Sequence, residues 1–300
     1  MIKRLKSYYL LADGAVFSFF QLVPESVIRT EQGRVKLHNW RGFIKLWLTN
    51  RKVRLSKNTV YLTVHSSYRG YYHWLLESIP KLLEAKRAAL NFTLLLPASY
   101  TEAFYADTLQ ILGIERVERL LSDTVYHVPQ GMLPYSAETM GNYSLPALQE
   151  LKSSMLAATA TVAPTVASRL YISRRKASRR KVLNEAEVEQ VLAAFGFTIL
   201  CFEDYTFAEQ VQLCANVHIL VGLHGAGLSN MVFLQEGATV VEFRKFDNGE
   251  NYFFQQLADT LQHTYHLLYC TAADEQQQVQ DADLWVDVDA LRAVLAQHSV

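Results

Sequence analysis

Apolar runs of strand length alternate with stretches of helical spacing through the second half of the chain. Four such runs predict buried strands, and they occupy residues 169–173, 197–202, 217–221 and 239–243. The segments between them carry apolar positions at helical spacing, which predicts helices over residues 184–195, 207–215 and 228–234. This alternation is typical of a Rossmann-like domain, in which helices cover a parallel sheet.

Two of these helix starts carry the spacing of a capping box. Asn184 is followed three residues later by Glu187, and Thr206 is followed by Glu209. In a capping box the first side chain binds the amide of the third helical residue, and the third side chain binds back. We therefore expect both helices to begin with this reciprocal pair.

The first half of the chain shows a similar alternation. Strands are predicted over residues 61–64, 91–96, 116–121 and 125–128, with short strands inside residues 16–29 that Pro24 interrupts. A helix is predicted over residues 101–112, and residues 71–83 predict an amphipathic helix that Pro80 kinks. We therefore expect a second doubly wound α/β domain.

Length and composition are consistent with two folded domains. The chain has 300 residues, half of them hydrophobic, which is enough for two cores of ordinary size. A segment rich in Ala, Thr and Val, residues 157–167, is the expected link. We place an N-terminal α/β domain at residues 1–160, a Rossmann-like domain at residues 161–275, and a closing strand and helix at residues 276–300.

Charge, cysteine content and hydropathy narrow the class of protein. The formal net charge is zero, which argues against a general nucleic-acid binder. Cys201, Cys214 and Cys270 lack metal-ligand spacing, and their sparse, odd number favours a reducing compartment, with each thiol packed in a core. No secretory signal or membrane-spanning run is visible. We therefore expect a cytoplasmic protein.

Two basic, aromatic segments bear on membrane contact. They are residues 3–9 and residues 41–54. Such segments suit a peripheral contact with anionic lipid at the inner membrane face. Solvated surface is the more common outcome for such a pattern, and both interpretations stay open.

A glycine-rich loop follows the predicted strand at residues 217–221. His224 is surrounded there by Gly222, Gly225, Ala226 and Gly227. Small residues let the backbone approach a ligand closely, and free amides at a helix start suit an anion such as a diphosphate. Tight turns use the same residues, and His224 can equally cap or pack. The loop is therefore a candidate anion site, and the features around it decide between these interpretations.

Two further features lie at the carboxyl ends of neighbouring predicted strands. The strand at residues 169–173 is followed by a basic turn containing Arg174, Arg175, Lys176, Arg179, Arg180 and Lys181. Glu242 lies at the end of the strand at residues 239–243. Ligands of such sheets bind at this edge, where arginines suit phosphate and a carboxylate suits ribose hydroxyls.

The alternatives for these two features are ordinary. The basic turn also suits a solvated or nucleic-acid-binding face, but the stacking aromatic residues of the latter are not interleaved there. Glu242 has Arg244 and Lys245 nearby as salt-bridge partners. The coincidence of all three features at one sheet edge favours a nucleotide-linked donor.

A possible acid–base pair lies in the predicted helix at residues 71–83. His73 and Glu77 are four residues apart, so their side chains project from the same helical face. A base held by a carboxylate at this spacing can remove a proton from an acceptor hydroxyl. A hydrogen-bonded pair at a domain surface is the alternative.

The combination of these segments resembles the family 61 glycosyltransferases. The resemblance rests on residues 171–177 with the basic residues behind them, on residues 202–210, and above all on residues 221–230. Tyr72-His73-Trp74 is similar to a further element of the family. Together these segments cover about residues 71–243, and it is their order, more than any one of them, that is specific.

The resemblance implies a GT-B-like architecture, in which two Rossmann-like domains face a cleft and the closing helix crosses back to the first domain. It also implies an inverting transfer with no metal and no other cofactor. Two Asp-x-Asp triplets, beginning at Asp281 and Asp287, lie in the acidic tail away from the glycine loop. We interpret them as surface residues rather than metal ligands.

The resemblance also implies roles for individual residues. Arg174 would hold the diphosphate, with Arg179 and Arg180 as helpers or structural partners. The donor would be lined by His224 and the backbone of Gly225, Ala226 and Gly227, with Glu242 at the ribose. His73 and Glu77 would act on the acceptor. Many family members carry aspartate in place of Glu77, so the identity of the base stays open.

We therefore expect an inverting, metal-independent glycosyltransferase with a UDP-sugar as donor. The acceptor would be an oligosaccharide or lipid-linked glycan in polysaccharide biosynthesis, such as that of a capsule. A non-catalytic nucleotide- or glycan-binding module of the same fold is the main alternative. A hydrolase with an oxyanion loop at residues 224–227 is disfavoured, because no G-x-S-x-G elbow occurs.

Overall fold

The computed structural model describes residues 1–27, 40–65, 69–88, 90–135, 141, 143–162, 168–246, 252–279 and 281–298. Its internal contacts divide the chain into two compact units, Met1–Tyr143 and Ser144–Val300. The predicted link at residues 157–167 extends in part beyond the described residues, and its first two residues end helix α5 (Leu145–Ala158), which belongs to the second unit. Each unit contains one sheet with helices, so the mixed α/β class is confirmed.

The sheet of the first unit is mixed rather than purely parallel. Its strands run in the order β3-β2-β1-β8-β5-β6-β7, and β4 also pairs with β8. Their bounds are β1 Ile2–Leu10, β2 Val16–Ser18, β3 Gln21–Leu22, β4 Arg51–Arg54, β5 Tyr61–Thr63, β6 Thr93–Pro97, β7 Val117–Leu120 and β8 Thr124–Pro134. Strands β4 to β8 pair with one another in parallel, and β1 to β3 pair antiparallel. Strands β5 to β7 match the predicted alternation, and helix α4 (Ala103–Ile111) lies between β6 and β7 in the chain.

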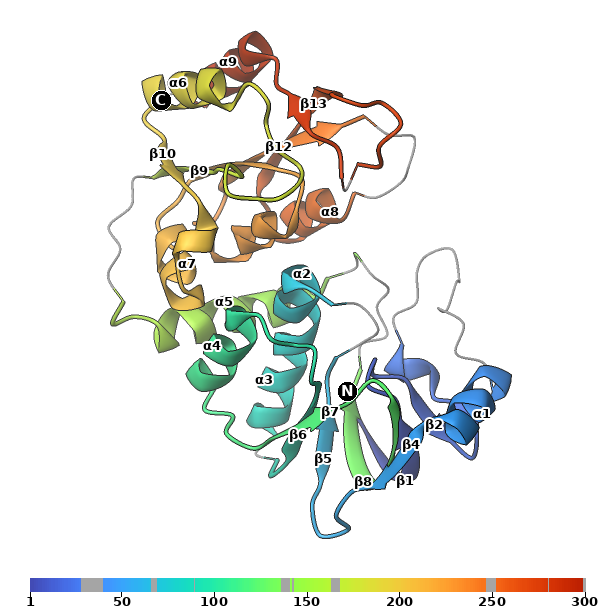
Figure 1. Ribbon diagram of the computed structural model, residues 1–300. Helices are drawn as coiled ribbons and strands as arrows, with labels where there is room; N and C mark the ends of the chain where they lie inside the picture. Colours follow the sequence, from blue (N-terminus) through green and yellow to red (C-terminus); the bar gives the residue numbers. More distant parts are fainter. Residues whose placement is uncertain are drawn as a thin grey trace. The chain divides into compact units, whose positions relative to one another are not determined.

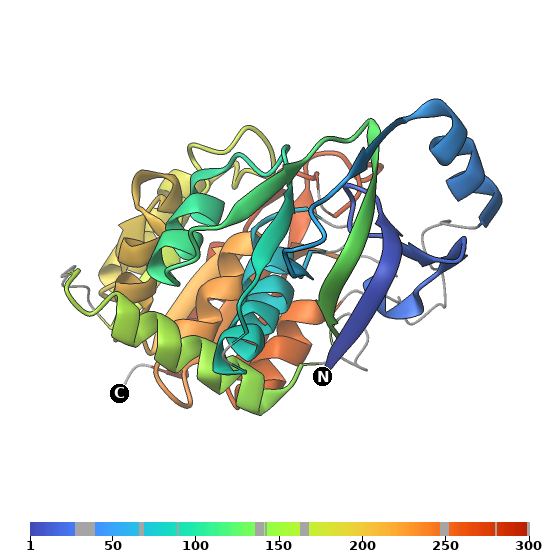
Figure 2. The same ribbon diagram turned by 90° about the horizontal axis from the view of Figure 1, so that it is seen from below.

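Strand β1 was not predicted, because its basic side chains obscure the alternation. It pairs antiparallel with β8 over nearly its whole length, from Ile2 opposite Pro134 to Leu10 opposite Tyr126. The two strands run side by side in Figure 2. Tyr8 and Leu10 are fully buried, whereas Lys3 and Lys6 lie in the more exposed half of the strand.

A tight hairpin follows β1. Strands β2 and β3 are joined by Phe19 and Phe20, whose φ angles are +48° and +62°. Two-residue hairpins of this conformation favour Asn-Gly, because the left-handed region costs a bulky residue about 1–2 kcal/mol. Helix α1 (Trp40–Thr49) packs beside the hairpin, with the rings of Phe43 and Phe17 stacked 4.1 Å apart. Pro24 begins a 3-10 turn after β3, Pro24–Ser26.

The helix predicted at residues 71–83 is confirmed and continues to Arg87. It consists of α2 (Tyr71–His73), a π-helical segment η2 (Trp74–Ser78) and α3 (Ile79–Arg87). The amide of Ile79 bonds to the carbonyl of Trp74, five residues back. Pro80 has no amide to donate, and the widened turn directly before it takes the place of a sharp kink.

The sheet of the second unit is parallel except at one edge. The strand order is β10-β9-β11-β12-β13-β14, in which only β14 is antiparallel. The bounds are β9 Arg169–Ile172, β10 Thr198–Leu200, β11 Ile219–Leu223, β12 Thr239–Lys245, β13 Thr264–Ala272 and β14 Leu284–Trp285. The first four strands are those that the apolar runs predicted. If the five parallel strands are numbered by their order in the chain, they lie across the sheet as 2-1-3-4-5, which is a doubly wound arrangement.

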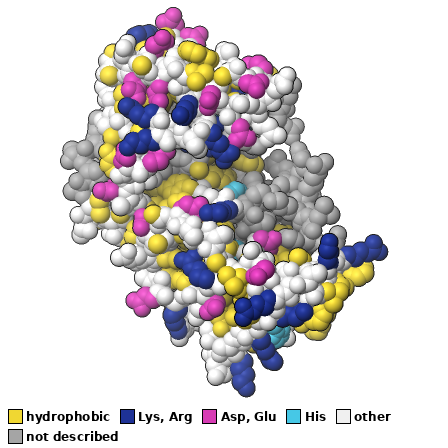
Figure 3. Space-filling view, in the orientation of Figure 1, with side chains coloured by type: hydrophobic (Ala, Val, Ile, Leu, Met, Phe, Trp, Pro, Cys, Tyr) yellow, Lys and Arg dark blue, Asp and Glu magenta, His cyan; other side chains and the backbone are white. Residues whose placement is uncertain are grey.

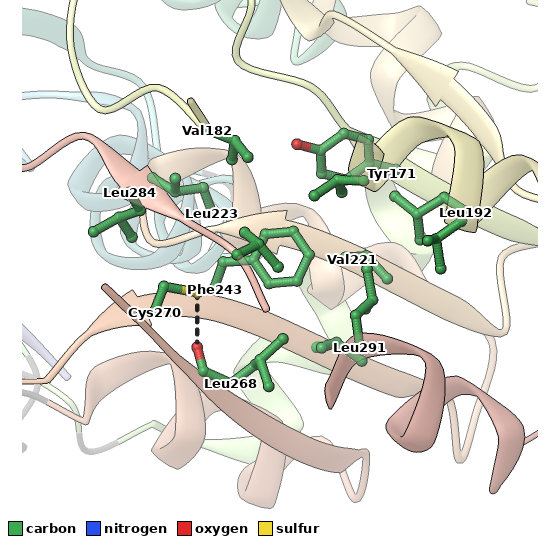
Figure 4. Close-up of a cluster of buried hydrophobic side chains, with 14 of the residues drawn as sticks. Tyr171, Val182, Leu192, Val221, Leu223, Phe243, Leu268, Cys270, Leu284 and Leu291 are labelled. Carbon is green, nitrogen blue, oxygen red and sulfur yellow. Dashed lines mark hydrogen bonds between the residues drawn. The ribbon is translucent and has the colours of Figure 1, made fainter. Parts of the chain in front are cut away.

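Helices cover both faces of this sheet (Figure 1). On one side lie α6 (Glu185–Ala194) and α9 (Val288–Ala296), and on the other α7 (Phe207–Cys214), the 3-10 helix η4 (Ala226–Phe233) and α8 (Phe253–Thr260). Leu192 and Leu291 come from the first pair of helices and pack on Val221 and Phe243 of the sheet (Figure 4). Helix α9 thus contributes to the core of the second unit.

One of the two predicted helix caps is present and the other is not. The side chains of Thr206 and Glu209 form a reciprocal capping box at the start of α7. Asn184 does not cap α6, so that prediction was wrong. Its side chain instead donates to the carbonyl of Val286 and accepts the amide of Val286, 2.8 and 3.0 Å away. These tertiary bonds tie the start of α6 to the end of β14.

No helix in the described ranges is long and apolar enough to cross a membrane.

Candidate functional site

The strand order places a switch point between β9 and β11. The chain runs from β9 outward to β10 and then returns to the other side of β9 as β11. In sheets of this kind the loops at the carboxyl ends of these two strands diverge and leave a binding crevice. The basic turn follows β9 and the glycine loop follows β11, so two of the predicted features meet at this point.

A direct hydrogen bond joins the two loops. Arg180 Nη1 donates to the main-chain carbonyl of His224 over 3.0 Å. A Cβ atom at Gly225 would lie 3.4–3.5 Å from the guanidinium of Arg180, so the bare glycine leaves this guanidinium directly against the loop backbone. Arg180 itself has φ +56°, a left-handed conformation that bulky residues rarely adopt. The surrounding contacts hold it in this strained state.

Arg174 supports the same turn from within. Its Nε donates to the carbonyl of Arg180 over 3.0 Å, and its Nη2 donates to that of Arg179 over 3.2 Å. Burial lowers the pKa of Arg174 from its usual value. Burial, and then the neighbouring charges of Arg174 and Arg179, lower the pKa of Arg180 to about 10. Both groups remain cations at neutral pH, held close together and partly desolvated.

Three further basic residues of the turn are neutralised by carboxylates. Arg175 pairs with Glu189 and Lys176 with Asp204, each at 2.5 Å, and Arg179 pairs with Asp281 at 2.6 Å. Within the described chain, Arg174 and Arg180 form no such ion pair, and Nε of Arg180 is buried without a hydrogen-bond partner. Of the four arginines in the turn, Arg174 and Arg180 are therefore the two that no carboxylate pairs in the described chain.

His224 is held by a buried carboxylate. Its Nδ1 is hydrogen-bonded to Oε1 of Glu242, and the hydroxyl of Tyr265 donates to Oε2 of the same carboxylate. Only 2% of Glu242 is exposed, against 15% of the His224 side chain. Burial, and then the charge of Glu242, raise the pKa of Tyr265, which keeps its hydroxyl protonated as a donor. The ring of Phe254 packs edge-on against His224 at 5.4 Å.

Tyr265 is a site residue that the sequence analysis missed. Register explains its position: Val240 of β12 is opposite Tyr265 of β13, and Glu242 lies two residues further along the same face. Lys245, one alternative partner for Glu242, binds the carbonyls of Glu275 and Gln277 instead. Nothing in the local sequence pairs Tyr265 with Glu242, because their contact depends on how two strands align.

The glycine loop leads into η4, the predicted short helix. The amide of His224 donates to the carbonyl of Phe243, and that of Leu228 to the carbonyl of Gly225. Amides of the first turn of a helix have no partner within it, so those of Ala226 and Gly227 are candidates for an anion. A Cβ atom at Gly227 would meet Ile172 at an ordinary 3.6 Å, so packing within the chain does not require glycine there.

The predicted acid–base pair is formed in the first unit. His73 Nδ1 and Glu77 Oε1 are 3.0 Å apart, and the two side chains are 19% and 18% exposed. Among the described residues, Oε2 of Glu77 has no hydrogen-bond partner and is buried. A carboxylate that accepts the Nδ1 proton of an imidazole selects the tautomer in which Nε2 carries the lone pair, as a general base requires.

Further titratable groups surround this pair. Lys81 lies one turn beyond Glu77 and donates to the carbonyl of Val64 over 3.3 Å; burial lowers its pKa, and the charge of Glu77 opposes that shift. The hydroxyls of Tyr72 and Tyr143 are hydrogen-bonded, and burial raises the pKa of both. The spacing of Lys81 from Glu77 was visible in the sequence, whereas Tyr143 is far away along the chain.

Three of the four aspartates in the two Asp-x-Asp triplets have structural partners. Asp281 pairs with Arg179, Asp283 accepts the amide of Lys181, and Asp287 caps α9 by accepting the amides of Asp289 and Ala290. Within the ranges that the structure describes, no group of three or more His, Cys, Asp or Glu side chains is arranged to hold a metal ion.

Arginines and loop amides gathered at the switch point of a parallel sheet are characteristic of nucleotide-binding α/β proteins. The sequence model of the family Glycosyltransferase 61 matches residues 71–241, which include both His73 and His224. The chain belongs to this family.

Curated relatives are similar over shorter segments. Human protein O-linked-mannose beta-1,4-N-acetylglucosaminyltransferase 2 is 43% identical over 70 residues, which cover 22% of this chain and 12% of the human protein. The EGF domain-specific O-linked N-acetylglucosamine transferase of Drosophila melanogaster is 37% identical over 75 residues, 24% of this chain and 14% of its own. The chicken protein of the same name is 34% identical over 79 residues, 25% and 15% of the two chains. The matched segments thus span a small part of each relative.

Proposed function

We propose that this protein is a glycosyltransferase that transfers a sugar from a UDP-sugar to a glycan hydroxyl with inversion and without a metal. The observation that carries the proposal is the pair of unneutralised guanidiniums, Arg174 and Arg180, beside the glycine loop. A diphosphate at this place would compensate both charges. It would also accept hydrogen bonds from the amides of Ala226 and Gly227.

On the donor side the roles follow from position. Arg174 would stabilise negative charge developing on the leaving diphosphate, which is electrostatic catalysis in place of a metal. Arg180 would share this task, while Arg179, paired with Asp281, would support the turn. The bare positions Gly225 and Gly227, with Ala226 between them, would let the donor approach the backbone.

Glu242 would act on the donor through His224. Its carboxylate is 2% exposed and accepts from both His224 and Tyr265. We assign it as the residue that positions His224, with Nδ1 toward the carboxylate and Nε2 toward the donor. The expected contact of Glu242 with ribose stays a prediction. A structure with UDP bound would show whether Glu242 contacts the ribose or positions His224.

On the acceptor side, His73 would be the general base and Glu77 its partner. Glu77 would orient the imidazole through Nδ1 and stabilise the imidazolium that forms. The acceptor oxygen, once deprotonated, would attack the anomeric carbon from the face opposite the nucleotide. The assignment requires a GT-B-like arrangement, in which the first unit supplies the acceptor side and the second the donor side of a cleft.

The first sugar to test is N-acetylglucosamine. It is the sugar in the names of the curated relatives, which act on O-linked mannose or on EGF domains. We propose an oligosaccharide or lipid-linked glycan of polysaccharide biosynthesis, such as that of a capsule, as the acceptor here. A cytoplasmic location with a peripheral contact to the inner membrane face is part of the same proposal.

The direct test measures UDP release from a panel of nucleotide sugars, with and without EDTA. We expect one UDP-sugar to raise the thermal stability of the protein and to be turned over in the presence of glycan acceptors. EDTA should leave the rate unchanged, and NMR of the product should show the inverted anomeric configuration. A rate abolished by EDTA and restored by a divalent ion, or a retained configuration, would remove the corresponding part of the proposal.

A further inference from the structure

The tip of the first hairpin presents two phenylalanines to solvent. Phe19 is 91% exposed and Phe20 is 39% exposed, and both occupy the left-handed backbone region. A polar, flexible pair such as Asn-Gly would form this turn at lower conformational cost. Large rings in a strained and exposed position indicate that the side chains serve a contact outside the unit.

Helix α1 extends this apolar tip. Trp40, Ile44 and Leu48 follow one another at intervals of four along the helix and so form one row. Trp40 is 54% exposed and Leu48 is 65% exposed, whereas Phe43 faces inward and is buried. Only part of the apolar surface of the helix is thus packed against the unit. The row of Trp40, Ile44 and Leu48 faces outward.

The hairpin and the helix form one surface. The ring of Phe20 lies 5.7 Å from that of Phe43 and 6.2 Å from that of Trp47. Phe19 adjoins Phe20 at the hairpin tip, so we count it with the exposed row of α1. We call this area, made by Phe19, Phe20, Trp40, Ile44 and Leu48, the hairpin–helix surface.

Positive charge lines the hairpin–helix surface. Residues 40–57 contain six basic residues and no acidic one. Arg41 and Lys45 form the helical row next to the apolar row, and Nζ of Lys52 lies 4.9 Å from the ring of Trp47. Figure 3 shows hydrophobic and basic side chains gathered together over α1, at the right edge of the view.

We propose that the hairpin–helix surface binds an anionic phospholipid bilayer. An interfacial helix inserts an apolar row among the acyl chains while neighbouring Lys and Arg contact anionic headgroups, and aromatic rings suit the boundary between them. A second copy of the chain fits less well, because two surfaces of the same positive charge repel each other. The hairpin–helix surface would make the peripheral contact that is part of the proposed function, and it would prefer anionic lipid. Vesicle binding tests this without any measurement of sugar transfer.

The test is sedimentation of the full chain with vesicles of phosphatidylcholine alone or mixed with phosphatidylglycerol. We expect binding to the anionic vesicles only, weakened by salt. Arg41→Gln with Lys45→Gln should reduce the vesicle affinity about 30-fold, since each removed charge weakens surface attraction. Phe19→Gly with Leu48→Ser should reduce it at least about tenfold.

Controls separate a local effect from a general one. Leu121→Ser and Arg292→Gln remove an exposed leucine and an exposed arginine elsewhere, and they should bind like the parent protein. Phe19→Gly by itself suits the positive φ, so we expect this variant to fold. Each of three results would overturn the proposal. The first is equal vesicle binding by all variants, and the second is equal binding to neutral and anionic vesicles. The third is a lack of vesicle binding together with a dimer that Phe19→Gly dissociates. Loss of sugar transfer with binding intact would count against the proposed function alone.

Discussion

Arg180 donates a hydrogen bond from Nη1 to the main-chain carbonyl of His224, and this contact of 3.0 Å joins the loops that follow β9 and β11. The two residues are 44 positions apart in the chain. The bond brings an unneutralised guanidinium to the start of the glycine loop, at the edge where a parallel sheet of this order binds ligands.

Arg174 and Arg175 are adjacent in sequence but differ in their charge environment. We expect Arg174→Ala to lower kcat/KM. The loss should correspond to about 2–4 kcal/mol of transition-state stabilisation, as it does when one anion-stabilising donor is removed elsewhere. Arg175→Ala is the matched control, because Arg175 is exposed and already paired with Glu189. Steady-state kinetics of UDP release compares the two. Equal losses in both variants would mean that the turn acts only as a general positive surface.

Arg180 combines an unfavourable backbone conformation with a useful charge. Arg180→Gly should leave the free energy of unfolding unchanged or raise it by about 1 kcal/mol, since glycine adopts a φ of +56° without strain. The same variant should bind UDP at least about tenfold more weakly, because one charge-assisted contact is lost. Urea denaturation and calorimetry measure the two quantities. A less stable variant with normal affinity would show that Arg180 is purely structural.

Glu242 and Tyr265 should affect the donor through His224. Glu242→Gln keeps the size of the side chain but weakens the bond to His224 Nδ1, and we expect a loss of activity of about 10- to 100-fold. Tyr265→Phe should cause a smaller loss in the same direction, because it removes one donor to the carboxylate. His224→Ala combined with Glu242→Gln should be no worse than His224→Ala alone. Additive losses would point to a separate contact of Glu242 with the donor.

His73 is expected to act on the acceptor and not on UDP. His73→Ala should lower kcat by about 10²–10⁴-fold, the usual contribution of a general base. The affinity for UDP should not change, which calorimetry checks independently of turnover. Glu77→Gln should retain part of the activity, because the imidazole persists without its carboxylate partner. Normal turnover of His73→Ala would leave a nucleotide-binding role for the chain or place the base elsewhere.

His65 should make the protein sensitive to mild acid. Burial lowers its pKa from 6.5 to about 4, because the charged imidazole is poorly solvated in the core, and the hydrogen bond to the carbonyl of Ala12 opposes this shift only in part. The unfolded chain therefore binds this proton more readily. The folded state should lose up to about 3 kcal/mol as pH falls from 6.5 toward 4. His65→Gln should flatten this part of the profile, measured by urea denaturation across pH. Parallel profiles for both proteins would contradict the assignment.

Local patterns along the chain were sufficient for most of the second unit. Strands β9 to β12 follow from apolar runs that are continuous in sequence, and the Thr206–Glu209 cap forms from residues three apart. The position of His224 and the arginines at one sheet edge also follows, because parallel strands place their carboxyl ends together. The pairing of His73 with Glu77 depends only on helical spacing.

Pairings between distant segments could not be predicted in this way. Strand β1 is a strand because β8, more than a hundred residues away, pairs with it. Asn184 looks like a cap, but its partner is Val286, 102 positions further on. Phe19 and Phe20 lie at a hairpin tip that their residue types do not favour.

The sequence by itself determined the class of site, because residue types and local periodicity decide which chemical groups gather at a strand end. Only the tertiary structure decided which of those groups remain available. Arg175, Lys176 and Arg179 are neutralised by carboxylates 14, 28 and 102 positions away, whereas Arg174 and Arg180 keep their charge. Ion pairing depends on distances in space, and these appear only when the strands and loops have packed.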